Sequence, residues 1–407
     1  MAKYYPQISL SYNNLSGFDE AFICRRFFNN QQESFTKDLK TLMKMTNNSF
    51  DQINTTAAPD KNDSVYGDKY DGLKQSLNTM SVILYSVAFV LGVLGNGVVI
   101  WVTGFKMKKT VNTVWYLNLA VADFLFTAFL PLSVTYIASG FHWPFGKFMC
   151  KLNTTISSLN MFASVYILVV ISVDRCVSVV WPVWAQNHRN VRKASYVSLC
   201  VWVVALILSA PYFIFRDTEK MSENQILCFT NYALSDNYTA PSVIRFRHLA
   251  MTITRLFLGF AVPFTVIVSC YAVLIHHLRR NRTMASQSTR TFKIVTAVIV
   301  TFFLCWAPFY IIGVIELVKF TSATQSNTLD LVIGVGMPLA TSLAFLNSCF
   351  NPLLYVFIGH DFKDKVRKSI RNVLETVFQE EETHTRTYTG SVVTSQNKNS
   401  SDLNTEV

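Results

Sequence analysis

Long apolar runs with few charges dominate the middle of the chain. Seven runs reach the length of about 18 or more residues that a helix needs to cross a membrane; they are residues 80–104, 111–138, 148–173, 194–215, 250–278, 292–318 and 329–358. Strands of a membrane barrel would give weaker segments of about ten residues with alternating polarity. The pattern therefore predicts an all-α membrane protein, a bundle of seven transmembrane helices.

Composition and charge support this assignment and orient the bundle. Hydrophobic residues make up 51% of the 407 residues and charged residues only 15%, whereas soluble domains carry about 25% charged residues. Lys and Arg gather in the segments 105–110, 189–193, 279–290 and 363–371, which lie on one side of the bundle. The positive-inside rule makes that side cytoplasmic. The net charge of +11 is then a topology signal, and the charges at helix ends do not favour nucleic-acid binding.

The segment before the first run, residues 1–79, is polar and is predicted to be an extracellular tail. It contains four glycosylation acceptors, Asn14, Asn47, Asn54 and Asn62. Tyr66 and Tyr70 lie among aspartates, so this part is either a sulfated acidic patch or a plain solvated tail. With the bundle at 80–358, an odd number of spans leaves the N-terminus outside and the C-terminus inside.

The segment after the last run divides into two parts. In residues 359–378 apolar side chains recur every fourth position between basic ones, which predicts an amphipathic helix on the inner membrane surface; they are Phe362, Val366, Ile370 and Leu374. Residues 379–407 are disordered by composition, and Thr or Ser at every second position from 383 to 391 are kinase acceptors. The last residues, Thr405, Glu406 and Val407, suit a PDZ-type domain that captures a C-terminal carboxylate.

Eight cysteines are present, and two of them lie at the outer end of the bundle. Cys150 lies at the outer end of the third run, and Cys228 lies in the outer loop 216–245. Because that side is oxidising, we expect a disulfide between them that holds the loop over the bundle. Cys24, in the tail, is left over.

Polar residues inside the runs are the candidates for function, because an ionisable group in a membrane is costly. One carboxylate lies among amides and a hydroxyl at mid-membrane depth; the set is Asn96, Asp123, Ser164, Asn347 and Asn351. Hard cations prefer oxygen ligands, so this set predicts a site for a small cation such as sodium at Asp123. A water-filled polar core that holds the helices together is the alternative.

Two further features of the runs are a lone cation and a set of prolines. Arg255 has no acid in its own run, so it needs an anion either from another helix, with Glu316 as the internal candidate, or from a ligand. Proline weakens a helix, and Pro263, Pro308 and Pro352 are predicted to kink three runs. Trp306, two residues before Pro308, is either a lever at a kink or an ordinary core side chain.

Taken together, the motifs resemble a rhodopsin-like, class A G-protein-coupled receptor. They are GN at 95–96, LAxAD at 119–123, DRC at 174–176, CWxP at 305–308 and NPxxY at 351–355, with Tyr271 in the fifth run. The stretches FLPLSVTY, HWPFG, NMFASV and PVWAQNHR are similar to the chemoattractant group, nearest the chemerin receptors and next the formyl-peptide and anaphylatoxin receptors. The resemblance covers residues 80–373.

The resemblance implies roles for these residues. Arg255, Glu316, Tyr136 and Asn160 would contact a peptide or protein ligand, and the C-terminal carboxylate of the ligand would meet Arg255. At rest Asp174 would hold Arg175, and on activation Arg175 would turn to the G protein, Tyr271 and Tyr355. The start of the sixth run, SQSTRTFKIV, has no acid, so a lock between Arg175 and that helix is predicted to be absent. The implied partners are an inhibitory-class G protein, arrestin and receptor kinases, at the plasma membrane.

Other classes of function remain as alternatives. A transporter or channel would show internal repeats or paired charges in broken helices, and the two halves of this chain show no repeat. An arrestin-biased scavenging receptor is a second alternative, although Asp174, Arg175 and Asn351 are intact. No arrangement of Cys, or of Ser, His and Asp, predicts an enzyme. No cofactor other than a modulating sodium ion is expected.

Overall fold

The computed structural model describes residues 63–234, 240–280, 285–322 and 327–358, with Arg367 and Arg371 as isolated positions. Side-chain surroundings are described for fewer residues, since 63–71, 278–294, 321–327 and 355–358 are excluded. The chain forms two units. The smaller comprises Met1–Asp63 and Lys319–Thr324, of which only position 63 and one helical turn are described. The larger holds the helical bundle.

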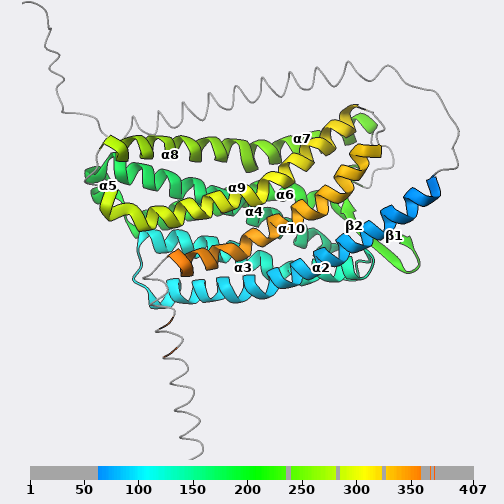
Figure 1. Ribbon diagram of the computed structural model, residues 1–407, viewed down its shortest axis with the longest axis horizontal. Coiled ribbons are helices and arrows are strands. Elements are labelled where there is room, and N and C mark those ends of the chain that lie inside the picture. Colours follow the sequence, from blue (N-terminus) through cyan, green and yellow to red (C-terminus); the bar gives the residue numbers. More distant parts are fainter. Residues whose placement is uncertain are drawn as a thin grey trace, which may run out of the picture. The chain divides into compact units, whose positions relative to one another are not determined.

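Seven helical segments in the described part are long and apolar enough to cross a membrane, as predicted. The first is α2 (Asp63–Trp101) with the π-helix η1 (Val102–Lys106), followed by α3 (Val111–Ala138), α4 (Gly146–Val180) and α6 (Val191–Ile214). The fifth is continuous through α7 (Pro241–Leu256), the π-helix η2 (Phe257–Ala261) and α8 (Val262–Arg280), and the last two are α9 (Ala285–Ser322) and α10 (Asn327–Ile358). Figure 1 shows these segments running alongside one another.

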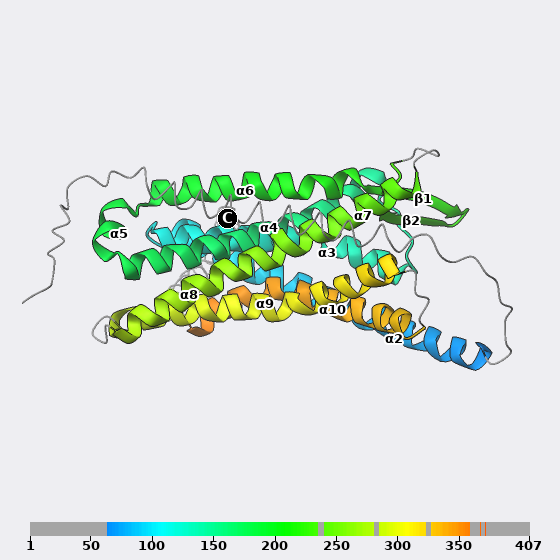
Figure 2. The same cartoon turned by 90° about the horizontal axis from the view of Figure 1, so that it is seen from above.

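Three features differ from the predicted boundaries. The first helix begins at Asp63 rather than near residue 80, so the segment with Tyr66 and Tyr70, expected in the tail, is helical. The outer loop contains an antiparallel hairpin, β1 (Arg216–Ser222) and β2 (Gln225–Thr230). A short helix, α5 (Pro182–His188), follows α4. In Figures 1 and 2 it lies at the end of the bundle opposite the hairpin. The hairpin end is called the outer end and the α5 end the inner end, after the orientation that the sequence predicts.

Several expected features lie outside the described residues. They are the glycosylation acceptors, Cys24, and most of the segments 359–378 and 379–407. Arg367 and Arg371 are both helical, which is consistent with the expected inner helix at those two positions only.

Local sequence explains where the inner helix ends form. Thr110 caps α3 by accepting a hydrogen bond from the backbone of Thr113, whose hydroxyl in turn accepts one from the Thr110 backbone. This reciprocal arrangement satisfies two otherwise unpaired donors. Asn190 caps α6 in the same way, by accepting from the Lys193 N–H. The two short polar loops therefore start helices directly, without a long connection.

The helix α4 is the centre of the bundle (Figure 2). In its most apolar stretch 61% of the residues are buried, whereas the share is 17–39% in the other six spans. This helix packs against α3, α6 and α8. Phe162, Ile167 and Leu168 of α4 are almost fully buried, and Phe302 of α9 belongs to the same cluster. The residues that α4 carries are therefore held more firmly than those on the outer helices.

Glycines allow α2 to approach its neighbours closely. A Cβ atom added to Gly92 would overlap the side chain of Thr127 in α3, and one added to Gly95 would lie 3.0 Å from Pro352 in α10. In lipid, close packing between helices replaces the hydrophobic effect as a source of stability. These two glycines thus bring α2 against α3 and α10.

We expect Gly92→Ala to lower the free energy of unfolding by about 1–3 kcal/mol, because the added methyl group overpacks the contact with Thr127. Thermal unfolding of the purified protein in detergent would measure the change. Gly97→Ala is the matched control on the same helix, since its Cβ would lie 3.7 Å from the Phe124 ring, an ordinary contact. Equal destabilisation by both substitutions would contradict this account.

Candidate functional site

The outer end of the bundle is closed by the predicted disulfide. Cys150 in α4 and Cys228 in β2 are bonded, and both are buried together with Trp143. The prediction of this bridge is confirmed. The bridge fixes the β hairpin to the outer turn of the most buried helix.

Hydrogen bonds and an ion pair add to this attachment. The Trp143 N–H donates to the Ile226 carbonyl at 2.8 Å, and the Tyr136 hydroxyl donates to the Cys228 carbonyl at 3.4 Å. Lys147 and Asp217 form an ion pair at 2.8 Å. Burial alone would raise the pKa of Asp217, but the hydrogen bonds from Lys147 and the Thr218 N–H outweigh it and lower that pKa. The hairpin is therefore held as a fixed cover.

Tyr136, predicted as a ligand contact, supports this cover. Its ring packs edge-on against Phe141 and Trp143, at centroid distances of 5.4 and 5.6 Å. Its hydroxyl is occupied by the Cys228 carbonyl. The ring is half-buried, so its described role is to position the hairpin.

Arg216, at the start of β1, is a cation that sequence reasoning did not single out. Its guanidinium donates to the Cys228 carbonyl and to the Thr230 hydroxyl, both at 3.0 Å. Among the residues that the structure describes, no carboxylate pairs with it. Burial lowers the pKa of Arg216, because desolvation disfavours the charged form. Its position directly after the fourth apolar run was the sequence signal that could have identified it.

Arg255 lies in the last turn of α7, immediately before η2. Its guanidinium stacks over the Phe309 ring, 4.9 Å from the centroid, a cation–π contact. It forms no ion pair within the described part of the chain. Tyr232 lies within electrostatic reach of both Arg255 and Arg216, so the two cations flank one tyrosine.

Glu316, the expected internal partner of Arg255, does not pair with it. The carboxylate is half-buried and lies within electrostatic reach of Tyr232 and His248. No ion pair joins it to any residue in the described ranges. The internal ion pair between Arg255 and Glu316, one of the two explanations for Arg255, is therefore not formed in this structure. A partly desolvated cation without an anion is costly, and both Arg216 and Arg255 are in this position within the described part of the chain.

The polar core is assembled around Asp123, which is fully buried in α3. Its two carboxylate oxygens accept hydrogen bonds from the side-chain amides of Asn160 at 2.9 Å and Asn351 at 2.7 Å. The Asn96 amide donates to the Ser348 carbonyl at 2.8 Å. Four helices, α2, α3, α4 and α10, thus meet in one network.

Asn160 is part of this core. The resemblance placed it among the ligand contacts, but it is 5% exposed and binds Asp123. It lies ten residues inward from Cys150, which is about 15 Å along a helix at 1.5 Å per residue. That depth is the physical reason that it joins the core.

Several buried oxygens of this core have no hydrogen-bond partner among the described residues. They are the oxygens of Ser164, Asn347, Asn351 and Asn96. Unsatisfied buried acceptors are rare and require an explanation. Together with the carboxylate of Asp123 they are an all-oxygen donor set, which fits a small hard cation.

The inner end differs from the expected arrangement. Asp174 pairs with Arg189 at the end of α5, at 2.8 Å between the carboxylate and Nε. Arg175 instead donates to the Asn112 side chain at 2.7 Å. The expected pair of Asp174 with Arg175 is thus not formed. Arg189 reaches the carboxylate from the end of α5 and takes both of its oxygens, so the acid is already occupied.

The remaining predicted switch residues lie in the core and toward the inner end. Trp306 is 6% exposed and packs between Phe302 and Phe309, at centroid distances of 5.9 and 5.7 Å. Tyr271 lies within electrostatic reach of Arg175. Pro352 is buried against Gly95. The side chain of Tyr355 lies outside the described residues.

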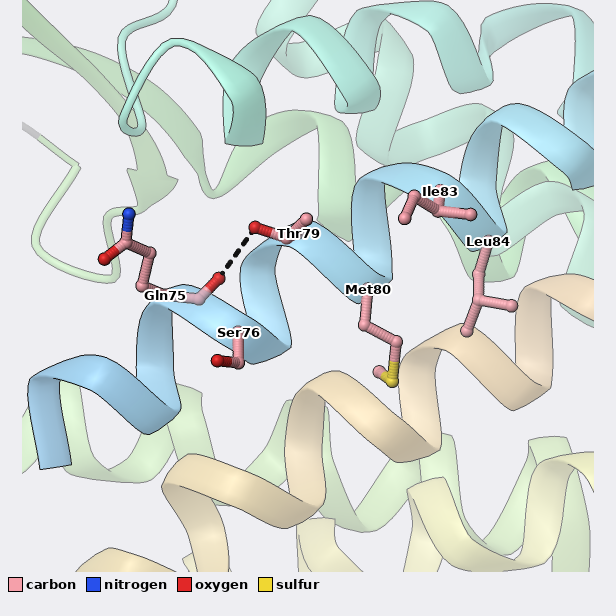
Figure 3. Close-up of a pocket in the computed structure, with 6 residues that line it drawn as sticks. All are labelled: Gln75, Ser76, Thr79, Met80, Ile83 and Leu84. Atoms are coloured by element: carbon pink, nitrogen blue, oxygen red, sulfur yellow. Dashed lines mark hydrogen bonds between the residues drawn. The ribbon is translucent and has the colours of Figure 1, made fainter. Parts of the chain in front are cut away.

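One pocket of the described part lies apart from all of these residues. Its volume is about 560 Å³, and one face of α2 lines it, from Gln75 to Leu84. Figure 3 shows these side chains along one helix, with the Thr79 hydroxyl bonded to the Gln75 carbonyl. It includes neither the outer cations nor the polar core, so it is not the candidate site.

Comparison with known proteins defines the family. Residues 95–355, more than half of the chain, match the model of the 7 transmembrane receptor (rhodopsin family). The chain belongs to this family. It is 49% identical over 290 residues to Chemerin-like receptor 1 of Rattus norvegicus, covering 69% of this chain and 76% of that protein. For Chemerin-like receptor 1 of Homo sapiens the identity is 44% over 327 residues, with 75% and 85% covered.

A third relative is the C3a anaphylatoxin chemotactic receptor of Oncorhynchus mykiss, at 44% identity over 311 residues, covering 76% of this chain and 82% of that protein. The resemblance to class A receptors is therefore confirmed, and with it the assignment to multi-pass receptors of the plasma membrane rather than to enzymes. Membership implies an extracellular ligand and a G protein as partners.

We expect Cys228→Ser to lower the free energy of unfolding by about 2–4 kcal/mol, because the bridge closes a long loop. The measurement is thermal unfolding of the purified receptor without reductant. Cys200→Ser is the control, since Cys200 is a free, exposed cysteine of α6. A Cys228→Ser midpoint within error of the Cys200→Ser midpoint would show that the hairpin is held by its other contacts alone.

Proposed function

We propose that the chain is a receptor for an extracellular chemoattractant peptide or protein, of the chemerin type, that couples to inhibitory-class G proteins. The observation that carries the proposal is the pair of cations at the outer end. Arg216 and Arg255 have no carboxylate partner in the described part of the chain. A ligand that ends in a free carboxylate supplies the missing anion.

The names of the relatives support the class of ligand. Two are chemerin-like receptors and a third is a chemotactic receptor for C3a. A formyl-peptide or anaphylatoxin-type receptor is therefore the alternative within the family. An arrestin-biased scavenger is a second one, and a transporter or channel is disfavoured by family membership.

The proposed orientation has the hairpin outside the cell and the basic loops inside. A disulfide forms on the oxidising side of the membrane, and Cys150–Cys228 lies at the hairpin end. The short helix α5 and the basic loop after it lie at the other end (Figure 2). The N-terminal tail is then extracellular and the C-terminal tail cytoplasmic.

The proposed mechanism is a shift between two states of the bundle. A ligand changes the equilibrium only through contacts that differ between the states. Arg255 stacks on Phe309, and Phe309 in turn packs on Trp306, two residues before Pro308. Capture of an anion by Arg255 therefore acts on the side chain next to the proline of α9, and a movement there changes the inner end of that helix.

We extend the proposal to the polar core, where Asp123, Ser164, Asn347 and Asn351 would hold a sodium ion. The ion would supply positive charge beside a buried carboxylate and so favour one packing of the four helices. The unpartnered oxygens of Ser164, Asn347 and Asn351 support this. Arrestin, receptor kinases and a PDZ-type domain are further proposed partners, and their sites in residues 379–407 lie outside the described ranges.

Suppression of cyclic AMP in cells, with a chemerin-type C-terminal peptide as free acid or amide, tests the ligand anchor. We expect Arg255→Ala to weaken the response to the free acid by roughly 30-fold or more, since truncating one member of a buried charge pair costs about 2–5 kcal/mol. Amidation of the peptide should weaken the response of the native receptor by a similar factor. It should have little further effect on the response of the Arg255→Ala variant.

Lys220→Ala is the control, because this cation is exposed on the strand that carries Arg216. Surface expression of each variant is measured in parallel. If amidation weakens both receptors equally, Arg255 does not meet the carboxylate. If only formylated or anaphylatoxin peptides give a response, the chain belongs to a neighbouring branch of the family.

Sodium should lower agonist affinity by roughly fivefold or more in the native receptor and have no effect on Asp123→Asn. The measurement is radioligand binding in membranes with NaCl against choline chloride at equal ionic strength. Ser209→Ala, fully buried in α6, is the control and should keep the sodium effect. A sodium effect of native size in Asp123→Asn would remove the ion from this core.

A further inference from the structure

Four polar side chains at the inner end of the bundle form one network. Arg189 donates from Nε to one oxygen of Asp174 at 2.8 Å and from Nη2 to the other at 2.9 Å. The same Nη2 also donates to the Asn112 side-chain oxygen at 2.6 Å. Arg175 reaches that oxygen with its own Nη2 at 2.7 Å. Two guanidinium groups thus share one neutral amide, while a single one takes the carboxylate.

The charges in this network are unevenly distributed. The Asp174 side chain is 13% exposed, and the two-pronged bond from Arg189 neutralises it. Arg175 is left with uncharged partners, the shared Asn112 oxygen and the Tyr116 hydroxyl, and its Nε has no hydrogen-bond partner in the described part of the chain. Arg175 is therefore the less firmly bound of the two arginines, although it is the one adjacent to the acid.

Arg189 belongs to a short element with few other anchors. It ends α5, a helix of seven residues, and its N–H bonds to the Ala185 carbonyl. Ala185 is the buried residue of this helix, whereas Trp181 and Val183 are 55% and 71% exposed. The bond from Arg189 to Asp174 therefore joins α5 to the helix that carries Arg175.

We propose that Arg189 is a positioning residue for coupling, which occupies Asp174 and so leaves Arg175 free to turn toward the G protein. The inference rests on the proposed coupling function. It assigns to the segment after α4 a role in deciding which cation neutralises the acid. The start of the sixth helix has no acid that could restrain Arg175, so the contacts around Asp174 are left to control this arginine.

Removal of Arg189 would leave the carboxylate of Asp174 largely buried and without a partner. Such a group is costly, and Arg175 is the adjacent cation. Arg175 would then fold back onto Asp174 and be withheld from the G protein. When Asp174 is also neutralised, nothing captures Arg175, so the second substitution should reverse the effect of the first.

The experiment compares Arg189→Ala, Asp174→Asn and the double variant in the full-length receptor. Nucleotide exchange on a purified inhibitory-class G protein is measured with and without agonist peptide. We expect Arg189→Ala to lower the exchange rate by roughly fivefold or more, Asp174→Asn to keep or raise it, and the double variant to match Asp174→Asn. Arg192→Ala, which removes an exposed cation at the start of α6, should behave as the native receptor.

A merely structural role for Arg189 gives a different pattern. Arg189→Ala and the double variant both lose the bond to α5, so they would be equally impaired, and that outcome overturns the inference. Native exchange by Arg189→Ala would overturn it as well. Rescue by Arg189→Lys to an intermediate rate is expected, since one prong of the bond can be retained.

Thermal unfolding tests the pairing without any signalling. Asp174→Asn should lower the midpoint by about 2–4 °C in the native background, and clearly less in the Arg189→Ala background. The same substitution should keep its full effect in the Arg175→Ala background. If Asp174→Asn instead loses its effect in the Arg175→Ala background and keeps it in the Arg189→Ala background, Arg175 is the partner of Asp174 and the inference is overturned. If the native receptor catalyses no exchange, the proposed function fails while this cycle still decides the pairing.

Discussion

The bundle depends on how one buried carboxylate is held. Asp123 lies at the middle of the membrane, where an unpaired charge is costly, and amides from α4 and α10 donate to both of its oxygens. Lipid tails are as apolar as the helix surfaces, so packing and hydrogen bonds must hold the helices together. The contact of Gly92 with Thr127 serves the same purpose, because it brings α2 against the helix that carries Asp123. The arrangement of four helices follows from satisfying this single charge.

The two ends of the bundle treat their charges differently. At the inner end Asp174 is neutralised within the chain by Arg189. At the outer end Arg216 donates to neutral oxygens and Arg255 stacks on the Phe309 ring, and the half-buried Glu316 forms no ion pair with either of them. At the inner end the acid is satisfied and Arg175 is the cation left for a protein partner, whereas the outer cations gain free energy from the anion of a ligand. The charge distribution therefore favours binding outside and switching inside.

Much of the fold could be predicted from the sequence because the membrane constrains it strongly. Seven apolar runs can only be helices in lipid, and Cys150 and Cys228 were the cysteines expected near the outer face of the bundle. The hairpin was missed because short strands in a polar loop have no lipid-imposed pattern. The partner of Asp174 was missed because residues fifteen positions apart meet only through the geometry of α5. Long-range polar pairs depend on tertiary structure, which local patterns do not encode.

The helix α4 connects the two ends, and its sequence indicates which parts can move. It carries Cys150 at one end, Asn160 in the polar core and Arg175 at the other end, and it contains no proline. By contrast α9 and α10 contain Pro308 and Pro352, and the fifth span contains a π-helix. Proline and π-turns weaken the hydrogen-bond ladder locally. A buried, uninterrupted α4 is therefore the fixed reference, and movement between states belongs to the surrounding helices that contain a proline or a π-turn.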